Sequence, residues 1–102
     1  MCFLVVGLMP TRHAVVEWQD SAECCGGDPS PGHFTFELIL NEADRSLDFV
    51  YQTLTYQTGT NHSFYVGLQD ALGTSATNYV FSAATPPTTI AVGTSLHAVP
   101  NP

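Results

Sequence analysis

The sequence predicts an all-β domain, built as an antiparallel β-sandwich or a jelly-roll-like fold. Three observations lead to this class. Apolar residues recur at every second position in several short segments, which is the period of a half-buried strand and not of a helix. Turns rich in Gly, Pro, Asn and Asp separate those segments at short intervals. Charged residues make up only 11% of the chain, so the strong polar helix formers are scarce.

The first half of the chain contains four predicted strands. The opening segment is a continuous apolar run that Pro10 ends. In the second segment, Ala14, Val16 and Trp18 share one face. The third segment has the clearest alternation, and the short turn NEADRS joins it to the fourth, so we expect these two to form an antiparallel hairpin. The four strands are predicted at residues 2–8, 13–18, 33–41 and 47–53.

The second half contains shorter segments. One of them repeats the alternation with Phe64, Val66 and Leu68, and a turn through Gly73 leads to the next. The pair Pro86-Pro87 forces an extended connection or an edge. No helical segment is available to supply a parallel crossover, so antiparallel pairing is expected throughout. These strands are predicted at residues 63–69, 78–82, 89–92 and 95–99.

The predicted core collects large apolar side chains from the alternating faces. Trp18 is expected in the core because it shares its face with Ala14 and Val16, and Tyr51 belongs to the apolar face of its strand. The full set of predicted core residues is Trp18, Phe34, Phe36, Leu38, Leu40, Leu47, Phe49 and Val66.

Charge excludes two classes of partner. Arg12 and Arg45 are the only cations of the Lys and Arg type, against nine carboxylates, and the formal net charge is -7. Nucleic acid and anionic lipid both need clustered Lys and Arg, so neither is an expected partner. The apolar run at residues 1–9 is too short to span a membrane, which takes about 20 residues, and it lacks the basic start of a signal peptide. An export signal would lie outside this chain.

The sequence contains no recognisable catalytic constellation, and a non-enzymatic domain without a bound cofactor is expected. No G-x-S-x-G nucleophile motif and no Cys-His signature is present. Glu17 and Glu37 lie mid-strand and could be neighbours, as the paired acids of a small hydrolase would be, but two exposed strand acids are the simpler interpretation and the one we favour. The histidines are scattered over loops and strand ends, at His13, His33, His62 and His97.

Two kinds of binding site have candidate residues. Asp20, Glu23 and Asp28 lie in one acidic loop and could offer oxygen ligands to calcium, although no EF-hand pattern is present. Tyr56 and Tyr79 are the candidates for an aromatic platform that would stack on a sugar ligand.

The cysteines and one asparagine have candidate modifications. In an oxidising compartment, Cys2 could form a disulfide with Cys24 or Cys25, which leaves one thiol over. Adjacent cysteines rarely bond to each other, because that ring strains the peptide between them. Asn61 begins the sequon Asn-His-Ser and is a candidate for glycosylation.

The predicted strands contain five motifs: RHAVVEW (12–18), FTFELILN (34–41), LDFVY (47–51), YVGLQD (65–70) and GTSL (93–96). They resemble the second half of nidogen-like (NIDO-type) domains, as found in large bacterial secreted and surface proteins. The resemblance implies an extracellular β domain without catalytic residues. The family's first half has no counterpart here, so the chain could be the C-terminal part of a larger domain. The Cys24-Cys25 loop does not fit the family pattern.

These observations predict a single β-sandwich domain over residues 1–102, or part of a nidogen-like domain. Its expected function is that of a non-catalytic secreted or cell-surface module for adhesion, matrix association or architecture, with a protein or glycan partner. The alternative is a lectin-like, carbohydrate-binding module, with or without the help of calcium. The first strand is apolar on both faces and uncharged, which is typical of an interior strand. Because the family's preceding strands are missing beside it, self-association through this strand is expected. The competing expectation is that the C-terminal segment covers this strand.

Overall fold

The computed structural model describes residues 1–22, 32–55, 63–82 and 93–100 of the chain. All regular elements within these ranges are β-strands, so the predicted all-β fold is confirmed. The strands are β1 (Cys2–Val6), β2 (His13–Ala22), β3 (His33–Asn41), β4 (Leu47–Thr55), β5 (Ser63–Gln69), β6 (Ala76–Ser82) and β7 (Ser95–Ala98). The strand predicted at residues 89–92 lies outside the described residues.

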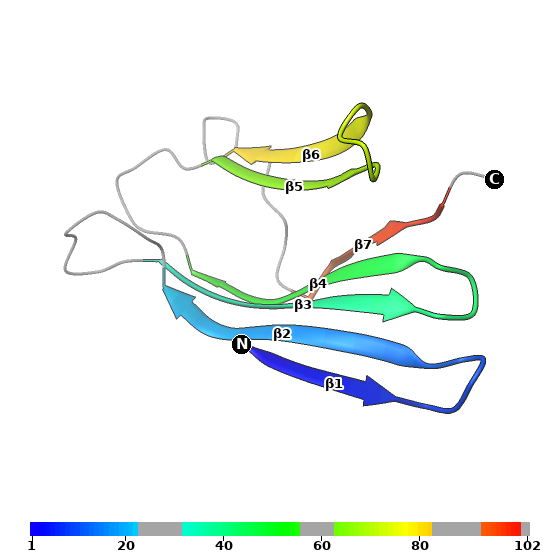
Figure 1. Ribbon diagram of the computed structural model, residues 1–102. Helices are drawn as coiled ribbons and strands as arrows, with labels where there is room; N and C mark the ends of the chain where they lie inside the picture. Colours follow the sequence, from blue (N-terminus) through cyan, green and yellow to red (C-terminus); the bar gives the residue numbers. More distant parts are fainter. Residues whose placement is uncertain (23–31, 56–62, 83–92, 101–102) are drawn as a thin grey trace. The chain divides into compact units, whose positions relative to one another are not determined.

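The strands belong to two compact units, which are described separately. The larger unit, Met1–Gln57 with Ala91–Pro102, contains a five-stranded sheet in the order β1-β2-β3-β4-β7 (Figure 1). The smaller unit, Thr58–Ile90, contains the hairpin β5-β6. Every strand pair in both sheets is antiparallel, as predicted. The packing of the two sheets into a sandwich stays a prediction.

The turn after β1 explains why this strand is shorter than predicted. Gly7 has a φ of 89°, a conformation that favours glycine. A Cβ atom at this position would lie 3.1 Å from the carbonyl oxygen of Thr11. The backbone N–H of Thr11 donates to the carbonyl of Leu8 at 2.8 Å, and the Met9–Pro10 peptide bond is cis. The chain therefore leaves the strand at Gly7 and turns back into β2.

The hairpin of β3 and β4 is formed as predicted, while β2 runs further than predicted. The backbone N–H of Asn41 donates to the carbonyl of Ser46 at 2.9 Å and closes the turn between β3 and β4. A bulge shifts the register of β2 against β3 between Trp18 and Ser21. Asp20 lies in this bulge with a φ of 48°. Because a bulge only interrupts pairing, β2 continues beyond it along β3.

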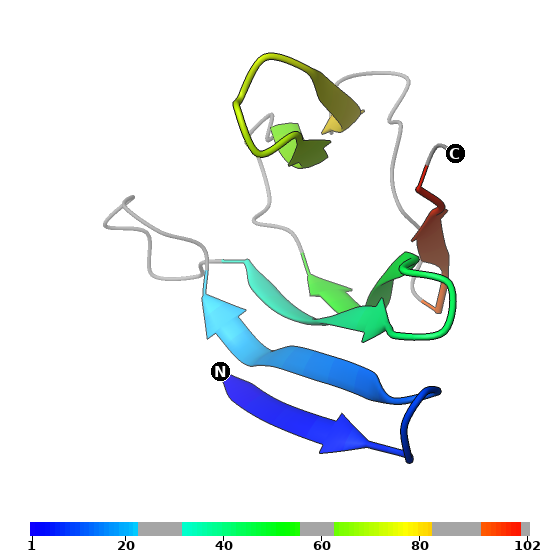
Figure 2. The same ribbon diagram turned by 45° about the vertical axis from the view of Figure 1, so that its right-hand side comes forward.

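The last strand, β7, pairs with β4 and not with β1 (Figure 2). Leu47 lies opposite Ala98, and Val50 lies opposite Ser95. The five-stranded sheet therefore has β1 at one edge and β7 at the other. The competing expectation, that the C-terminal segment covers the first strand, is wrong for this strand. The sequence signal was ambiguous because pairing between distant segments leaves no local pattern.

Alternation and register place most of the large apolar side chains of this sheet on one face, which we call the apolar face. Phe34 and Tyr51 are buried in it. At its centre Trp18 stacks on Phe36 with ring centroids 4.9 Å apart, and Phe36 lies 6.3 Å from Tyr51. The face consists of Phe3, Val5, Ala14, Val16, Trp18, Phe34, Phe36, Leu38, Leu40, Leu47, Phe49, Tyr51, Leu96 and Ala98.

The predicted core is correct for its aromatic centre and wrong for Leu40. Trp18 is half-buried within the stack, as expected for a packed side chain. Leu40 is 41% exposed. It lies beside the β3–β4 turn, where its partner on β2 is only Ala14, so nothing large covers it from that strand. The smaller unit contains a further predicted core residue, Val66, which is half-buried.

Candidate functional site

The first strand forms an exposed apolar edge of the sheet. Its side chains alternate between the two faces, and they are exposed on both. Exposure falls from 68% for Phe3 to 42% for Val6. Because β1 is first in the strand order, no described strand pairs with its outer side. We call the residues Phe3, Leu4, Val5 and Val6 the edge surface.

The edge surface lacks the usual protection of an edge strand. Natural sheets protect their edges with charged side chains, Pro, bulges or very short strands. The strand Cys2–Val6 contains no charge and no Pro, and its register against β2 is continuous over all five residues. Its backbone N–H and C=O groups thus offer a regular template to an incoming strand.

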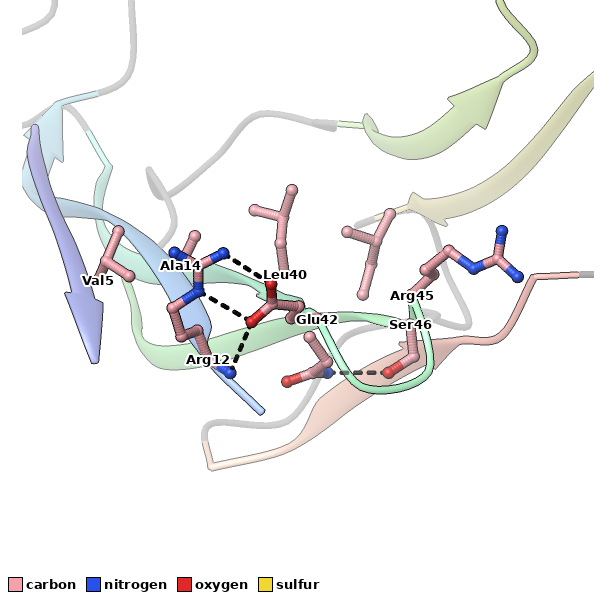
Figure 3. Close-up of a pocket in the computed structure, with 9 residues that line it drawn as sticks. Val5, Arg12, Ala14, Leu40, Glu42, Arg45 and Ser46 are labelled. Carbon is pink, nitrogen blue, oxygen red and sulfur yellow. Dashed lines mark hydrogen bonds and ion pairs between the residues drawn. The ribbon is translucent and has the colours of Figure 1, made fainter. Parts of the chain in front are cut away.

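A pocket of about 450 Å³ lies next to this edge, where β1, β2, β3 and the β3–β4 turn meet (Figure 3). Four aliphatic side chains of the apolar face form its floor, and polar residues of the two turns form its rim. The floor consists of Val5, Ala14, Leu40 and Leu47, and the rim of Arg12, Glu42, Arg45 and Ser46. Asn41 also lines the pocket, although its side chain is hydrogen-bonded to His13 and Asp48 on the opposite face.

An ion pair crosses one side of the rim. The Arg12 guanidinium donates to both carboxylate oxygens of Glu42, at 2.9 Å from Nε and 2.6 Å from the terminal nitrogen. The backbone N–H of Arg12 donates to the same carboxylate at 3.1 Å. These hydrogen bonds lower the pKa of Glu42 to about 2 and raise the pKa of Arg12. Glu42 thus neutralises Arg12 at neutral pH.

The turn on the other side of the rim holds Arg45. This residue has a φ of 59°, and no described residue forms an ion pair with it. The turn is fixed around Ser46, which is buried: its N–H donates to Asp44 at 2.9 Å, and its hydroxyl accepts from the Asn41 amide at 2.9 Å. The hydrogen bonds from Ser46 lower the pKa of Asp44. Arg45 therefore extends from a well-fixed turn.

A row of polar side chains crosses the opposite face of the sheet, over β2, β3, β4 and β7. His13 contacts the Asn41 amide oxygen at 2.6 Å, and the Asn41 amide nitrogen donates to Asp48 at 2.7 Å. A hydrogen bond between His97 and Asp48 completes the row. The bonds from His97 and Asn41 lower the pKa of Asp48. The sequence analysis missed this row, since only the register of four strands brings the residues together.

The two mid-strand acids are neighbours, as the sequence analysis considered. Glu17 lies directly opposite Glu37 in the register of β2 and β3, and both are half-buried. Their neighbours in the same row are Cys2 on β1 and Val50 on β4. These acids lie on the face opposite the pocket, so they do not line it.

The predicted calcium ligands are only partly described. Asp20 lies in the β2 bulge, where its backbone N–H donates to the Thr35 hydroxyl at 3.0 Å and its carboxylate contacts His33 at 2.9 Å. Glu23 and Asp28 lie outside the described residues. Among the residues that are described, no group of three His, Cys, Asp or Glu is placed to hold a metal ion. The calcium site stays a prediction.

The other predicted site residues are also described in part. Tyr56 lies outside the described residues, and so does the side chain of Tyr79, whose backbone belongs to β6. Cys2 is exposed at the start of β1, while its predicted partners Cys24 and Cys25 are not described. Neither is Asn61 of the sequon. The aromatic platform, the disulfide and the glycosylation therefore remain predictions.

The comparisons with known proteins place the chain in a family. Over the described residues, no helix is long and apolar enough to cross a membrane. No curated protein and no solved structure matches the chain. The family described as NIDO related matches residues 1–101, which include β1 as well as the motifs that resemble nidogen-like domains. Membership suggests an extracellular module. The chain therefore belongs to the NIDO-related family of domains.

Proposed function

We propose that this domain is a non-catalytic extracellular module for adhesion, matrix association or architecture, and that it joins protein partners by strand addition at β1. The observation that carries the proposal is the edge surface: a regular, uncharged strand at the sheet edge with apolar side chains exposed on both faces. Membership of the NIDO-related family supports the extracellular setting.

Strand addition explains why both faces of β1 are apolar. An added strand forms main-chain hydrogen bonds with the edge and places its own side chains alternately on the two faces of the sheet. Phe3 and Val5 would then pack beside it on the apolar face, and Leu4 and Val6 on the other. A partner that packed against only one face of the sheet would cover one of these two pairs and leave the other pair exposed. The pattern therefore favours a partner that continues the sheet.

The charge of the domain favours a protein as that partner. The formal net charge of -7 keeps the rest of the surface acidic and soluble, whereas β1 has no charged side chain. Because the acidic surfaces of two molecules repel each other, we expect association at the uncharged β1 edge. For the isolated chain, the partner at hand is a second copy, whose β1 can pair antiparallel with the first around a two-fold axis.

The carbohydrate-binding alternative has no support from the described aromatic side chains. One face of the Trp18 ring stacks on Phe36 within the sheet, so that face is not available to a sugar. This alternative now depends on Tyr56 and Tyr79, whose side chains lie outside the described residues.

Light scattering at micromolar concentrations tests the proposal. We expect the wild-type chain to form dimers or larger species, and Leu4→Lys to shift it to monomer, because a charge on an edge strand opposes pairing. The matched control is Leu72→Lys, which places the same charge on a leucine that is 84% exposed in the turn between β5 and β6.

The control should associate like the wild type. A monomeric wild-type chain that unfolds cooperatively over the same concentration range would contradict the proposal. Equal loss of association in both lysine variants would assign the effect to net charge instead of to β1.

A further inference from the structure

The two arginines of the chain come together at one pocket. Arg12 follows the turn after β1, and Arg45 belongs to the turn after β3, yet both line the same hollow (Figure 3). The chain has no other Lys or Arg, and its formal net charge is -7. Elsewhere this surface repels anions, so the pocket is the place where an anionic group can be held.

The floor of the pocket suits an aliphatic group. Val5, Ala14, Leu40 and Leu47 contribute methyl and methylene groups, and no aromatic ring is among the lining residues. Sugars are commonly held by stacking on aromatic rings, which this floor lacks. Its volume of about 450 Å³ lies within the range of small-molecule sites. The 41% exposure of Leu40 means that apolar surface remains available to a ligand.

The rim provides one uncompensated positive charge. The bidentate ion pair with Glu42 occupies Arg12, so this guanidinium fixes the wall instead of meeting a ligand. Figure 3 shows the Arg45 side chain on the other side of Leu40 from that pair, with its guanidinium directed away from the floor, and no described residue pairs with it. The guanidinium therefore has to turn toward the floor to meet a ligand in the pocket that Arg45 lines. A guanidinium binds a carboxylate through paired hydrogen bonds.

From this arrangement we propose that the pocket binds a small amphiphilic carboxylic acid, with its aliphatic body on the floor and its carboxylate on Arg45. A single negative charge matches the one uncompensated arginine. A dianionic phosphate would bring a second charge close to Glu42 and Asp44, which are both held ionised by their hydrogen bonds. The site shares Val5 with the edge surface, whereas Leu4 and Val6 point to the other face and do not line the pocket.

Titration with sodium octanoate, followed by amide chemical shifts, tests the site on the whole chain. Octanoate should shift the amides around Ala14, Leu40 and Leu47 in a saturable way. The neutral probe 1-octanol should bind at the same place about fivefold more weakly, which corresponds to about 1 kcal/mol for one exposed ion pair. Equal affinities for the two probes, or shifts elsewhere only, would overturn the proposal.

Variants of the rim and of the floor test the two parts of the proposal separately: the carboxylate on Arg45 and the aliphatic body on the floor. Arg45→Asn removes the charge and suits the positive φ, so it should lower octanoate affinity to the octanol level without changing octanol binding. Arg45→Lys should retain the preference for octanoate. Leu40→Ser should weaken both probes. A preference for octanoate that survives in Arg45→Asn would show that Arg45 does not hold the carboxylate.

The same titration on Leu4→Lys keeps this proposal distinct from strand addition. Leu4 does not line the pocket, so octanoate affinity should be unchanged. Loss of association with retained octanoate binding supports both proposals. Absent octanoate binding in a chain that still associates through β1 overturns the pocket alone.

Discussion

The two edges of the five-stranded sheet differ in the exposure of their apolar side chains and in the polar contacts beside them. β1 has five residues, all exposed and all uncharged. β7 has four residues that alternate strictly: Leu96 and Ala98 are half-buried, while Ser95 and His97 are exposed. The outer residue His97 is held against Asp48 of the neighbouring strand. β7 thus follows the usual pattern of a protected edge strand, and β1 does not.

The difference shows what an edge strand needs in order to remain unpaired. β7 is short, and its outward face ends in a polar row that is already hydrogen-bonded within the sheet. A strand added there would bury His97 and Asp48 at a cost in desolvation. At β1 an added strand would cover only apolar side chains and gain their burial. The comparison therefore favours β1 over β7 as the place of the proposed association.

The largest loss of stability is expected from a change in the aromatic stack at the centre of the five-stranded sheet. Trp18→Ala should destabilise the domain by about 3–5 kcal/mol, because it removes the ring that stacks on Phe36 at 4.9 Å. Urea unfolding followed by circular dichroism measures this change. Leu72→Ala, at an exposed leucine, is the control and should alter stability by less than about 0.5 kcal/mol.

An unchanged free energy of unfolding for Trp18→Ala would contradict the packing role. If glycan binding were lost at the same time, Trp18 would be a sugar platform, and the carbohydrate-binding alternative would be supported.

A smaller effect is expected at the β7 edge. Asp48→Asn should lower stability at neutral pH by about 1 kcal/mol, since a charged acceptor for His97 and Asn41 is lost. The pKa of Asp48 is lowered in the folded chain, so its contribution is present above the unfolded pKa of about 3.9 and is lost as pH falls through the folded pKa. The variant should therefore lose less stability than the wild type on acidification.

Unfolding of both proteins between neutral pH and about pH 2 provides the measurement. His97→Ala gives the matched background: in that variant, Asp48→Asn should cost less, because the partner is already absent. Identical acid profiles of wild type and Asp48→Asn would show that Asp48 does not link β7 to the sheet.

Local patterns in the sequence are enough to predict the strands and the hairpin. Alternation from Phe34 to Leu40 and from Leu47 to Tyr51, with a polar turn between them, leaves one antiparallel arrangement that buries both apolar sets. The first strand is different: its uncharged, two-sided apolar pattern is typical of an interior strand, so its exposed place at the edge of the sheet does not follow from that pattern. The nidogen-like motifs rest on the same strands, and the family match confirms them.

Features that depend on pairing between strands far apart in the chain cannot be predicted from local patterns in the sequence. The bulge between Trp18 and Ser21 is a backbone feature with no distinct alternation, so the end of β2 was placed too early. The pairing of β4 with β7 joins segments far apart in the chain, and with it comes the row that ends at His97. The pocket needs Arg12 and Arg45 together, which only the folded sheet provides.

Amide hydrogen exchange at the two edges, measured at low and at high protein concentration, tests the central claim most directly. If β1 is the site of strand addition, its outward amides become protected as concentration rises, while the amides of β7 exchange at an unchanged rate. Leu4→Lys should abolish the concentration dependence at β1. Protection at β1 that does not change with concentration, in a chain that nevertheless associates, would contradict the account.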